Sequence, residues 1–320
     1  MVINMNIVLL DRASLGADTP ISRLNSLGNT FVYDATAADE VCERVKDANI
    51  LIINKIKITE QVLKSAKNLK LICVFATGYD NIDIEAAKRY GVGVCNVPGY
   101  SSESVALFTV TTALSLFTHL REYNDFVRSG EYTDSGIANR LIPVYHELYG
   151  KKWGIIGYGG IGKAVGRIAE GFGAQLLVNK RTKIEGVRCV DIDTLCRESD
   201  IITIHCPLTD LTREMINKER IGLMKPSVVI VNAARGAVVN EKDISEAVIS
   251  GRIGGFSCDV YSIEPFGKDH PYNEIKSLPN VLLTPHAAWG AYEARERCLN
   301  IIIDNIKAFF SGEILNRVDN

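Results

Sequence analysis

The chain has 320 residues, a length that suits two domains of ordinary size better than one. Its 47% hydrophobic and 23% charged residues are typical of a soluble globular protein, and a net charge of −2 argues against a nucleic-acid binder, which needs clustered Lys and Arg. No apolar run approaches the roughly 20 residues of a membrane span, and the first residues lack a signal-peptide pattern, so we expect a cytoplasmic protein.

Short apolar runs alternate with amphipathic stretches through the first hundred residues. We expect strands at residues 6–10, 31–33, 50–54, 71–75 and 93–96. We expect helices around residues 38–46, 60–66 and 84–90. Apolar strands that alternate with helices predict a parallel sheet covered on both faces, here a flavodoxin-like α/β unit without a phosphate-binding loop of its own.

A longer helix is expected next, over about residues 102–128, because Ser101, Ser102 and Glu103 form a plausible cap. An irregular polar segment, 129–147, follows it. A second alternating series then predicts strands at residues 153–156, 175–179, 201–205, 228–232, 255–259 and 281–283. A final helix is expected over about residues 291–310.

The order of these elements predicts two doubly wound parallel-sheet domains. The final helix follows the last strand of the second series, so we expect it to return to the first unit. A flavodoxin-like substrate-binding domain then comprises residues 1–100 and 290–320, and a Rossmann NAD(P)-binding domain comprises residues 101–289. The active cleft is expected between the domains. The long helix and the irregular segment suit a twofold interface, so we expect a homodimer.

A glycine fingerprint follows the predicted strand 153–156. It reads Gly157-Tyr158-Gly159-Gly160-Ile161-Gly162, and a predicted helix over residues 163–171 comes after it. In this motif the first glycine permits a tight turn, the second lets the backbone approach a pyrophosphate, and the third lets helix and strand pack closely. Because the helix N-terminus also offers free N–H groups, the sequence predicts a dinucleotide cofactor.

The residues after the next strand bear on which dinucleotide is bound. An NAD enzyme places an acidic residue there for the ribose 2′-hydroxyl, but this sequence reads Val178-Asn179-Lys180-Arg181-Thr182. A cationic pair suits a 2′-phosphate, so NADP is favoured, with Arg181 and Lys180 on the phosphate. NAD remains the alternative, in which both charges point to solvent.

Three polar side chains follow successive strands of the second series, where ligand crevices form in open α/β sheets. They are Arg235, Glu264 and His286. Hydride transfer to a 2-keto acid needs a cation that holds the carboxylate and polarises the carbonyl, and Arg235 suits that role. It also needs a proton donor, for which His286 is suited, and a carboxylate beside that donor, for which Glu264 is suited.

Cysteine and histidine spacing predicts no metal site. The eight cysteines form no CxxC pair and most lie in apolar runs, so we expect reduced cysteines in the core. The five histidines show no HExxH or similar spacing of ligands.

The chain resembles the D-isomer-specific 2-hydroxyacid dehydrogenases over nearly its whole length. The motifs that carry the resemblance are Ala76-Thr77-Gly78-Tyr79-Asp80-Asn81-Ile82-Asp83, Asn96-Val97-Pro98-Gly99-Tyr100-Ser101, His205-Cys206-Pro207-Leu208-Thr209, Ala234-Arg235-Gly236, Asp259 through Glu264-Pro265, and Pro285-His286. By that resemblance Arg235, Glu264 and His286 are catalytic. It also implies that backbone N–H groups of the loop with Thr77 and Gly78 hold the substrate carboxylate, together with Arg235 and His286.

The resemblance also completes the expected cofactor contacts, with Asp259 at the nicotinamide end. The full expected set is Gly157, Gly159, Gly160, Ile161, Gly162, Lys180, Arg181, Cys206, Pro207, Ala233, Asp259 and His286. The sequence departs from the family pattern at three positions. Gly160 stands where many relatives carry Arg, Leu107 where many carry Glu or Gln, and Lys180 where an acidic residue is usual.

Within the family, the segments 97–101, 259–265 and 286–289 resemble the glycerate dehydrogenases, also called hydroxypyruvate reductases. This resemblance implies that NAD(P)H reduces hydroxypyruvate or glyoxylate to D-glycerate or glycolate. Two alternatives stay open. One is a dehydrogenase for another keto acid, of the lactate or phenyllactate type. The other is a dinucleotide-sensing binding protein, like the transcriptional corepressors of this fold.

Overall fold

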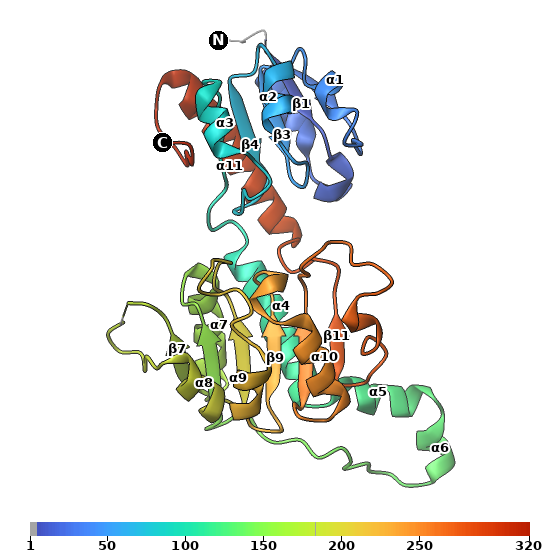
Figure 1. Ribbon diagram of the computed structural model, residues 1–320. Helices are drawn as coiled ribbons and strands as arrows, with labels where there is room; N and C mark the ends of the chain where they lie inside the picture. The colour runs from blue at the N-terminus through green and yellow to red at the C-terminus, as the bar shows by residue number, and fades with distance from the viewer. Residues whose placement is uncertain (1–4, 183) are drawn as a thin grey trace. The chain divides into compact units, whose positions relative to one another are not determined.

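The computed structural model describes residues 5–182 and 184–320, which form two compact units (Figure 1). Unit 1 comprises Met1–Ser101 and Gly290–Asn320, and unit 2 comprises Ser102–Trp289. Each unit has its own parallel β-sheet and its own buried core. The predicted α/β fold class, with two doubly wound parallel sheets, is confirmed.

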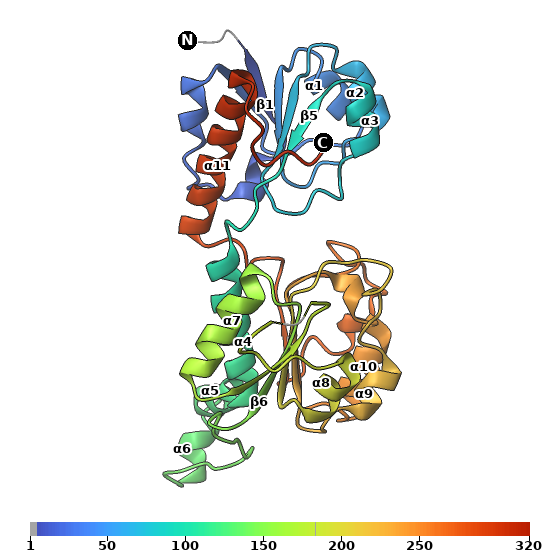
Figure 2. The ribbon, with the colours of Figure 1, turned by 90° about the vertical axis from the view of Figure 1, so that its left-hand side faces the viewer.

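The sheet of unit 1 has five parallel strands in the order β2-β1-β3-β4-β5, which is the flavodoxin-like order. The strands are β1 (Asn6–Leu9), β2 (Asn29–Val32), β3 (Ile50–Ile53), β4 (Leu71–Val74) and β5 (Gly93–Cys95). The helices are η1 (Arg12–Leu15), η2 (Ile21–Ser26), α1 (Val41–Arg44), α2 (Glu60–Ser65), α3 (Ile84–Arg89) and α11 (Tyr292–Ser311). Figure 2 shows α1, α2 and α3 on one face and α11 on the other, so β3 and β4 are buried along their whole lengths.

The helix predicted over residues 38–46 is wrong in length. Only α1, with four residues, is helical. Residues 38–40 form a turn, in which the backbone N–H of Glu40 donates to the carbonyl oxygen of Ala37 at 3.0 Å, and the Glu40 carboxylate accepts the backbone N–H of Ala37 at 3.0 Å. Strand β2 begins two residues before the predicted run, because it pairs along β1 with Asn29 opposite Asn6.

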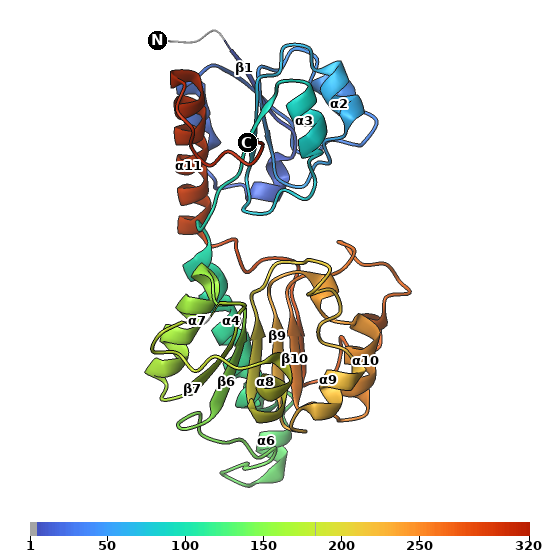
Figure 3. The ribbon, with the colours of Figure 1, turned by 60° about the vertical axis from the view of Figure 1, so that its left-hand side comes forward.

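The sheet of unit 2 has six parallel strands in the order β11-β10-β9-β8-β6-β7. The strands are β6 (Lys152–Ile156), β7 (Gln175–Asn179), β8 (Ile201–Ile204), β9 (Val229–Asn232), β10 (Gly255–Cys258) and β11 (Val281–Leu283). The helices are α4 (Ser102–Phe117), α5 (Leu120–Arg128), α6 (Glu131–Ser135), α7 (Gly160–Gly171), α8 (Ile192–Glu198), α9 (Lys218–Leu223), α10 (Glu241–Ile249), η3 (Gly236–Val238) and η4 (Pro271–Asn273). Helices α4 and α7 lie on one face of the sheet and α8, α9 and α10 on the other (Figures 2 and 3).

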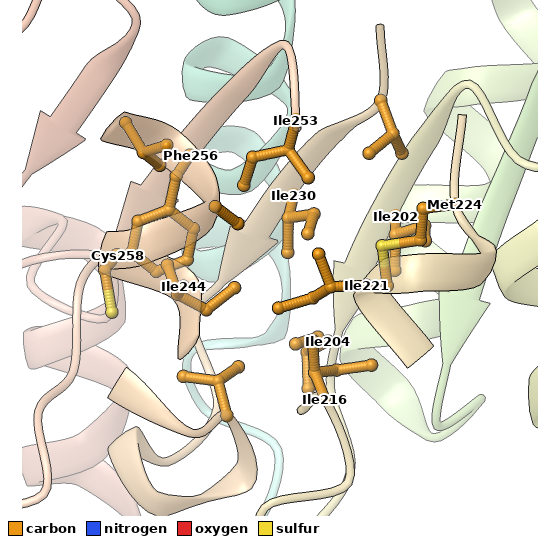
Figure 4. Close-up of a cluster of buried hydrophobic side chains, with 14 of the residues drawn as sticks. Ile202, Ile204, Ile216, Ile221, Met224, Ile230, Ile244, Ile253, Phe256 and Cys258 are labelled. Carbon is orange, nitrogen blue, oxygen red and sulfur yellow. The ribbon is translucent and has the colours of Figure 1, made fainter. Parts of the chain in front are cut away.

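A cluster of apolar side chains fills the space between this sheet and helices α9 and α10 (Figure 4). Its members from β8, β9 and β10 point toward those from the helices and the loops beside them. They include Ile202, Ile204, Ile230, Phe256, Ile221, Met224 and Ile244. Because this core fixes the strands, the loops at their carboxyl ends start from rigid positions.

The single long helix predicted over residues 102–128 is wrong, because the structure divides it into α4 and α5, bent by 65°. His119, between them, has a left-handed backbone with a φ of +54°, and its ring contacts Glu122. Eight residues of α4 are buried, whereas α5 has no buried residue among those described. No single helix in residues 5–182 and 184–320 is long and apolar enough to span a membrane; only α4 and α5 together meet that length and composition.

Candidate active site

The glycine fingerprint forms a tight turn between β6 and α7. Gly157 has a φ of +88°, and a Cβ there would lie 2.6 Å from the backbone nitrogen of Cys206. A Cβ on Gly162 would lie 2.2 Å from the carbonyl oxygen of Gly157. A Cβ on Gly159, the residue before α7, would meet nothing within 4 Å. This cradle, open at the N-terminus of a twelve-residue helix, fits the pyrophosphate of a dinucleotide.

Gly160 and Ile161 begin α7, and Ile161 is half-buried. A Cβ on Gly160 would lie 2.9 Å from the hydroxyl oxygen of Ser102, at the start of α4. A larger side chain at this position therefore fits only after a small movement of that hydroxyl.

The other expected cofactor contacts of unit 2 lie along the same edge of the sheet. Lys180 and Arg181 are exposed directly after β7, and Lys180 Nζ donates to the carbonyl oxygen of Tyr158 at 3.5 Å. Cys206 and Pro207 follow β8, and burial raises the pKa of Cys206 to about 11. Lys180 is therefore tied through Tyr158 to the turn that forms the cradle.

His205, directly after β8, is a buried polar group that sequence analysis assigned only to a motif. Among the residues that the structure describes, neither of its ring nitrogens has a hydrogen-bond partner. Burial lowers the pKa of His205 to about 3, because the charged ring cannot be solvated there. The residue as a whole is half-exposed, but both ring nitrogens point inward.

This burial should make the stability of the fold sensitive to acid. The unfolded chain binds a proton on His205 near pH 6.5, and the folded chain binds it only near pH 3. The contribution of neutral His205 to the free energy of unfolding is therefore complete above about pH 6.5 and is lost as the pH falls. We expect the free energy of unfolding to fall by about 3 kcal/mol between pH 7 and pH 4 through this group.

Urea unfolding at both pH values measures this loss. The His205→Phe variant, which keeps a ring but no titrating group, should lose less stability on acidification than the wild type, whereas exposed His146→Phe should match the wild type. An acid loss that is equal in wild type and His205→Phe would contradict the assignment.

Glu264 and His286, on the loops after β10 and β11, form a hydrogen-bonded pair. His286 Nδ1 lies 2.7 Å from Glu264 Oε2, with the two side chains 28% and 29% exposed. The other carboxylate oxygen of Glu264 accepts the backbone N–H of Tyr261 at 3.0 Å. With Nδ1–H donating to the carboxylate, Nε2 is the nitrogen that is presented for proton transfer, and the carboxylate stabilises the protonated ring.

Asp259, at the end of β10, holds the loop that carries His286. Its buried carboxylate accepts hydrogen bonds from Thr284 Oγ1 at 2.6 Å, from the backbone of Ala287 at 2.8 Å and from the backbone of Ala288 at 2.9 Å. His286 itself has a φ of +54°, a strained conformation for a residue other than glycine. The expected contact of Asp259 with the nicotinamide stays a prediction, beside this evident role in fixing the histidine loop.

Arg235 lies in the loop after β9, which packs directly on the loop that carries Glu264. Buried Asn232 closes the Arg235 loop, since its side chain donates to the Arg235 carbonyl at 3.0 Å and accepts from the backbone of Ala234 at 3.1 Å. A Cβ on Gly236 would lie 2.0 Å from the carbonyl carbon of Tyr261. The structure thus brings the Arg235 and Glu264 loops into backbone contact. Half-buried Ala233 is part of the same turn.

Thr77 and Gly78 lie at the carboxyl edge of the sheet of unit 1. Thr77 Oγ1 donates to the carbonyl oxygen of Val97 at 2.7 Å, and Asn96 Nδ2 donates to the carbonyl oxygen of Thr77 at 2.7 Å. These two bonds fix the backbone of a loop whose Thr77 is exposed.

Buried Asp11 fixes the neighbouring loop of unit 1. Its carboxylate accepts the backbone N–H groups of Asn54 and Lys55, and burial raises its pKa. Asp11 and Asn232 were not expected as site residues, and the signal that could have indicated them is a polar residue at the end of an apolar strand. Glu241 and His270 were not expected either, and no local pattern exists for them.

The chain is similar to proteins of a known family. Residues 110–288 match the family model described as "D-isomer specific 2-hydroxyacid dehydrogenase, NAD binding domain". The chain is 36% identical to a hydroxypyruvate reductase of Blautia hydrogenotrophica, covering 98% of this chain and 100% of that protein. It is 38% identical to a glyoxylate reductase of Thermococcus onnurineus, covering 85% and 83% respectively.

Solved structures show the same architecture. An acyclic imino acid reductase (Bsp5), in complex with NADPH and D-Arg, superposes with a TM-score of 0.85 at 29% identity, and the match covers 98% of this chain and all of that one. The matched family model spans more than half of the 320 residues. The chain belongs to the D-isomer-specific 2-hydroxyacid dehydrogenase family.

Proposed function

We propose that the protein reduces hydroxypyruvate or glyoxylate to D-glycerate or glycolate, using NAD(P)H. The single observation that carries the chemistry is the 2.7 Å hydrogen bond between His286 and Glu264, at the sheet edge that also bears the glycine cradle. Membership of the family makes the protein an NAD(P)-dependent 2-keto acid reductase. The choice of small hydroxylated or aldehydic acids rests on the relatives that are named for these substrates.

Each catalytic residue has one task in this proposal. When bound, the nicotinamide cofactor supplies the hydride. His286 donates the Nε2 proton to the carbonyl oxygen, and Glu264 stabilises the charged ring before that transfer. Arg235 binds the substrate carboxylate and polarises the carbonyl with its planar fork. Thr77 and Gly78 bind the carboxylate through their backbone N–H groups.

A panel of keto acids tests the substrate class directly. Hydroxypyruvate, glyoxylate, pyruvate and phenylpyruvate are compared by kcat/KM with each cofactor. The proposal requires hydroxypyruvate or glyoxylate to give the highest value. A preference for pyruvate or phenylpyruvate would support the same reaction on a different substrate. Tight cofactor binding without any turnover would favour a dinucleotide-sensing protein.

We also propose that NADP is the preferred cofactor, with Lys180 and Arg181 on its 2′-phosphate. Both cations are exposed directly after β7, and the sequence of residues 179–182 includes no carboxylate that would repel a phosphate. We expect Arg181→Gln to weaken NADPH binding about tenfold or more, because a charge-assisted bond to phosphate is lost. NADH binding should change less than about twofold.

Fluorescence titration of both cofactors measures these affinities. Arg197→Gln, an exposed arginine on α8, serves as the matched control and should leave both unchanged. A wild type that binds NADH more tightly than NADPH would refute the NADP preference.

We propose a homodimer formed through the arm, defined as residues 129–149. The arm extends away from the sheet of unit 2 (Figure 1) and exposes a row of apolar side chains. They are Ile137, Leu141, Ile142, Val144 and Tyr145, which are 54–78% exposed. Beside Glu264 and His286 lies a pocket of about 620 Å³ with largely apolar walls, including Phe266 and Leu283. The arm of a second copy would cover this pocket and shield the pair from water.

Light scattering tests the dimer. We expect the wild type at about twice 35.2 kDa, and the double variant Leu141→Asp, Ile142→Asp at the mass of one chain, because buried unpaired charges would disfavour the interface. Leu211→Asp, which alters an equally exposed leucine outside the arm, should leave the mass unchanged. A monomeric wild type would rule the dimer out.

A further inference from the structure

A second histidine–carboxylate pair lies directly behind the first. Glu241 is the first residue of α10, and its Oε2 lies 3.0 Å from His270 Nε2. The Glu241 side chain is 12% exposed and that of His270 is 8% exposed, so this pair is better shielded than Glu264 and His286. The catalytic roles proposed above use neither residue.

Three hydrogen bonds converge on the carboxylate of Glu241. Ser262 donates twice, from its backbone N at 2.9 Å and from Oγ at 2.5 Å. His270 Nδ1 accepts the backbone N–H of Tyr272 at 3.2 Å, so Nε2 is the nitrogen that carries the proton and donates to Glu241. Glu241, Ser262 and His270, here called the brace, therefore form a closed set in which every donor faces an acceptor.

The brace is joined to the catalytic carboxylate through two consecutive peptide units, which meet at the Cα of Tyr261. The backbone N–H of Tyr261 donates to Glu264, and the next N–H along the chain, of Ser262, donates to Glu241. Gly236 packs closely against the second of these peptides, because a Cβ there would lie 2.2 Å from Ser262 N. The Tyr261–Ser262 peptide therefore has little room to rotate. A movement that breaks its bond to Glu241 also turns Tyr261, whose own N–H is bonded to Glu264.

Aromatic packing adds stiffness around the brace. The ring of His270 lies 4.6 Å from that of Phe266 and 4.8 Å from that of Tyr272, and the rings of Tyr261 and Phe266 are 4.7 Å apart. The bond between His270 and Glu241 joins side chains that are 8% and 12% exposed, so it resists exchange with water better than the bond between His286 and Glu264, which are more than a quarter exposed. Ser262 is itself exposed, so the rigid part of the brace is the Glu241–His270 pair.

We propose that Glu241 and His270 are positioning residues, which hold the Tyr261–Ser262 peptide so that Glu264 meets His286 in the geometry that proton transfer needs. The inference rests on the proposed function of His286 as proton donor. It predicts that damage to the brace slows the proton-transfer step and leaves the cofactor cradle intact.

Two variants remove the brace, and each has a matched control. Glu241→Gln sets an amide N–H₂ among three donors, and His270→Phe keeps the ring but loses the donor. We expect both to lower kcat about 10- to 100-fold, since small misplacements of catalytic groups have effects of this size, with the affinity for NADPH unchanged. His270→Gln, whose amide nitrogen replaces Nε2, and Glu246→Gln, on the exposed part of α10, should stay within about threefold of the wild type.

Two kinetic measurements separate positioning from general damage. The solvent deuterium isotope effect on kcat should rise in Glu241→Gln, because proton transfer becomes slower. In a double-mutant cycle, Glu241→Gln should add little to the loss caused by Glu264→Gln, because it acts through that carboxylate. The proposal would be overturned if the losses of kcat caused by Glu241→Gln and Glu264→Gln multiplied in the double variant. It would also be overturned if kcat fell only in proportion to a loss of cofactor-binding sites.

One readout does not need turnover. Proton NMR should show a downfield N–H resonance for His286 Nδ1 bonded to Glu264, identified by its absence in His286→Gln. We expect it to broaden or vanish in Glu241→Gln and to persist in Glu246→Gln. If the wild type reduces no keto acid, the proposed function fails. This resonance alone then tests whether the brace positions Glu264 against His286. A resonance unchanged in Glu241→Gln would refute positioning even in an active enzyme.

Discussion

The His286→Ala variant should lose about 10²- to 10⁴-fold of the wild-type kcat, the usual contribution of a well-placed acid–base group. The imidazole is the proton donor in the proposal, and its Nδ1 is already engaged by Glu264 at 2.7 Å. Alanine leaves no group to protonate the forming alkoxide. Steady-state kinetics with hydroxypyruvate and NADPH measure the loss, in the reduction direction and in reverse.

Controls for this variant follow from its position. His286 is itself an expected cofactor contact, but the affinity for NADPH should fall much less than kcat, because the cradle at Gly157 and Gly162 lies on other loops. Glu264→Gln should fall between the wild type and His286→Ala, since it weakens support for the charged ring but keeps the donor. Glu219→Ala, at an exposed site on α9, should keep full activity. Wild-type turnover in His286→Ala would remove the histidine from the mechanism.

Replacing Arg235 by lysine should lower kcat/KM about 10²- to 10³-fold, even though the positive charge is kept. The planar guanidinium offers two parallel donors to a carboxylate, and an ammonium group offers a single point. The Arg235 loop is fixed by Asn232 and seated against Tyr261, so the backbone cannot advance to compensate for a shorter reach. Both an increase in KM and a decrease in kcat are expected, because the fork binds the carboxylate and polarises the carbonyl.

Chemical rescue distinguishes loss of the fork from damage to the loop. Added guanidinium ion, at concentrations too low to unfold the protein, should restore part of the activity of Arg235→Ala. The same addition should do nothing for His286→Ala. Arg213→Lys is the matched control for Arg235→Lys, because Arg213 lies in an exposed part of the connection after β8. Its kcat/KM should equal that of the wild type. Failure of guanidinium to rescue Arg235→Ala, with cofactor binding intact, would argue against the carboxylate-binding role.

Much of the fold is readable from sequence because its signals are local. Apolar runs such as 50–54 and 71–75 match β3 and β4 to within a residue, since strands buried on both faces need continuous apolar character. The break at His119 is different. No glycine or proline marks it, and a left-handed histidine there depends on the burial of α4 against the sheet while α5 stays exposed.

Some residues of the candidate site can likewise be predicted from local sequence signals, and others cannot. Glu264 and His286 are found by their places after successive strands, and parallel strands bring such loops together. Asp259 is visible in the sequence, but its three donors at Thr284, Ala287 and Ala288 are not, because they depend on how one loop folds over another. The brace is hidden for that reason too, since Glu241 and His270 are 29 residues apart in the chain and carry no spacing of their own.

Burial of the cysteines has a consequence for oxidative chemistry. Alkylating agents and peroxide attack the thiolate, and a thiol with a pKa of about 11, as at Cys206, is ionised to only about one part in 10⁴ at neutral pH. Burial raises the pKa of Cys73 and Cys95 as well. The thiol nearest the glycine cradle is thus kept in its unreactive form. We therefore expect oxidants and alkylating agents to react only slowly with Cys206 and to leave the cradle unmodified.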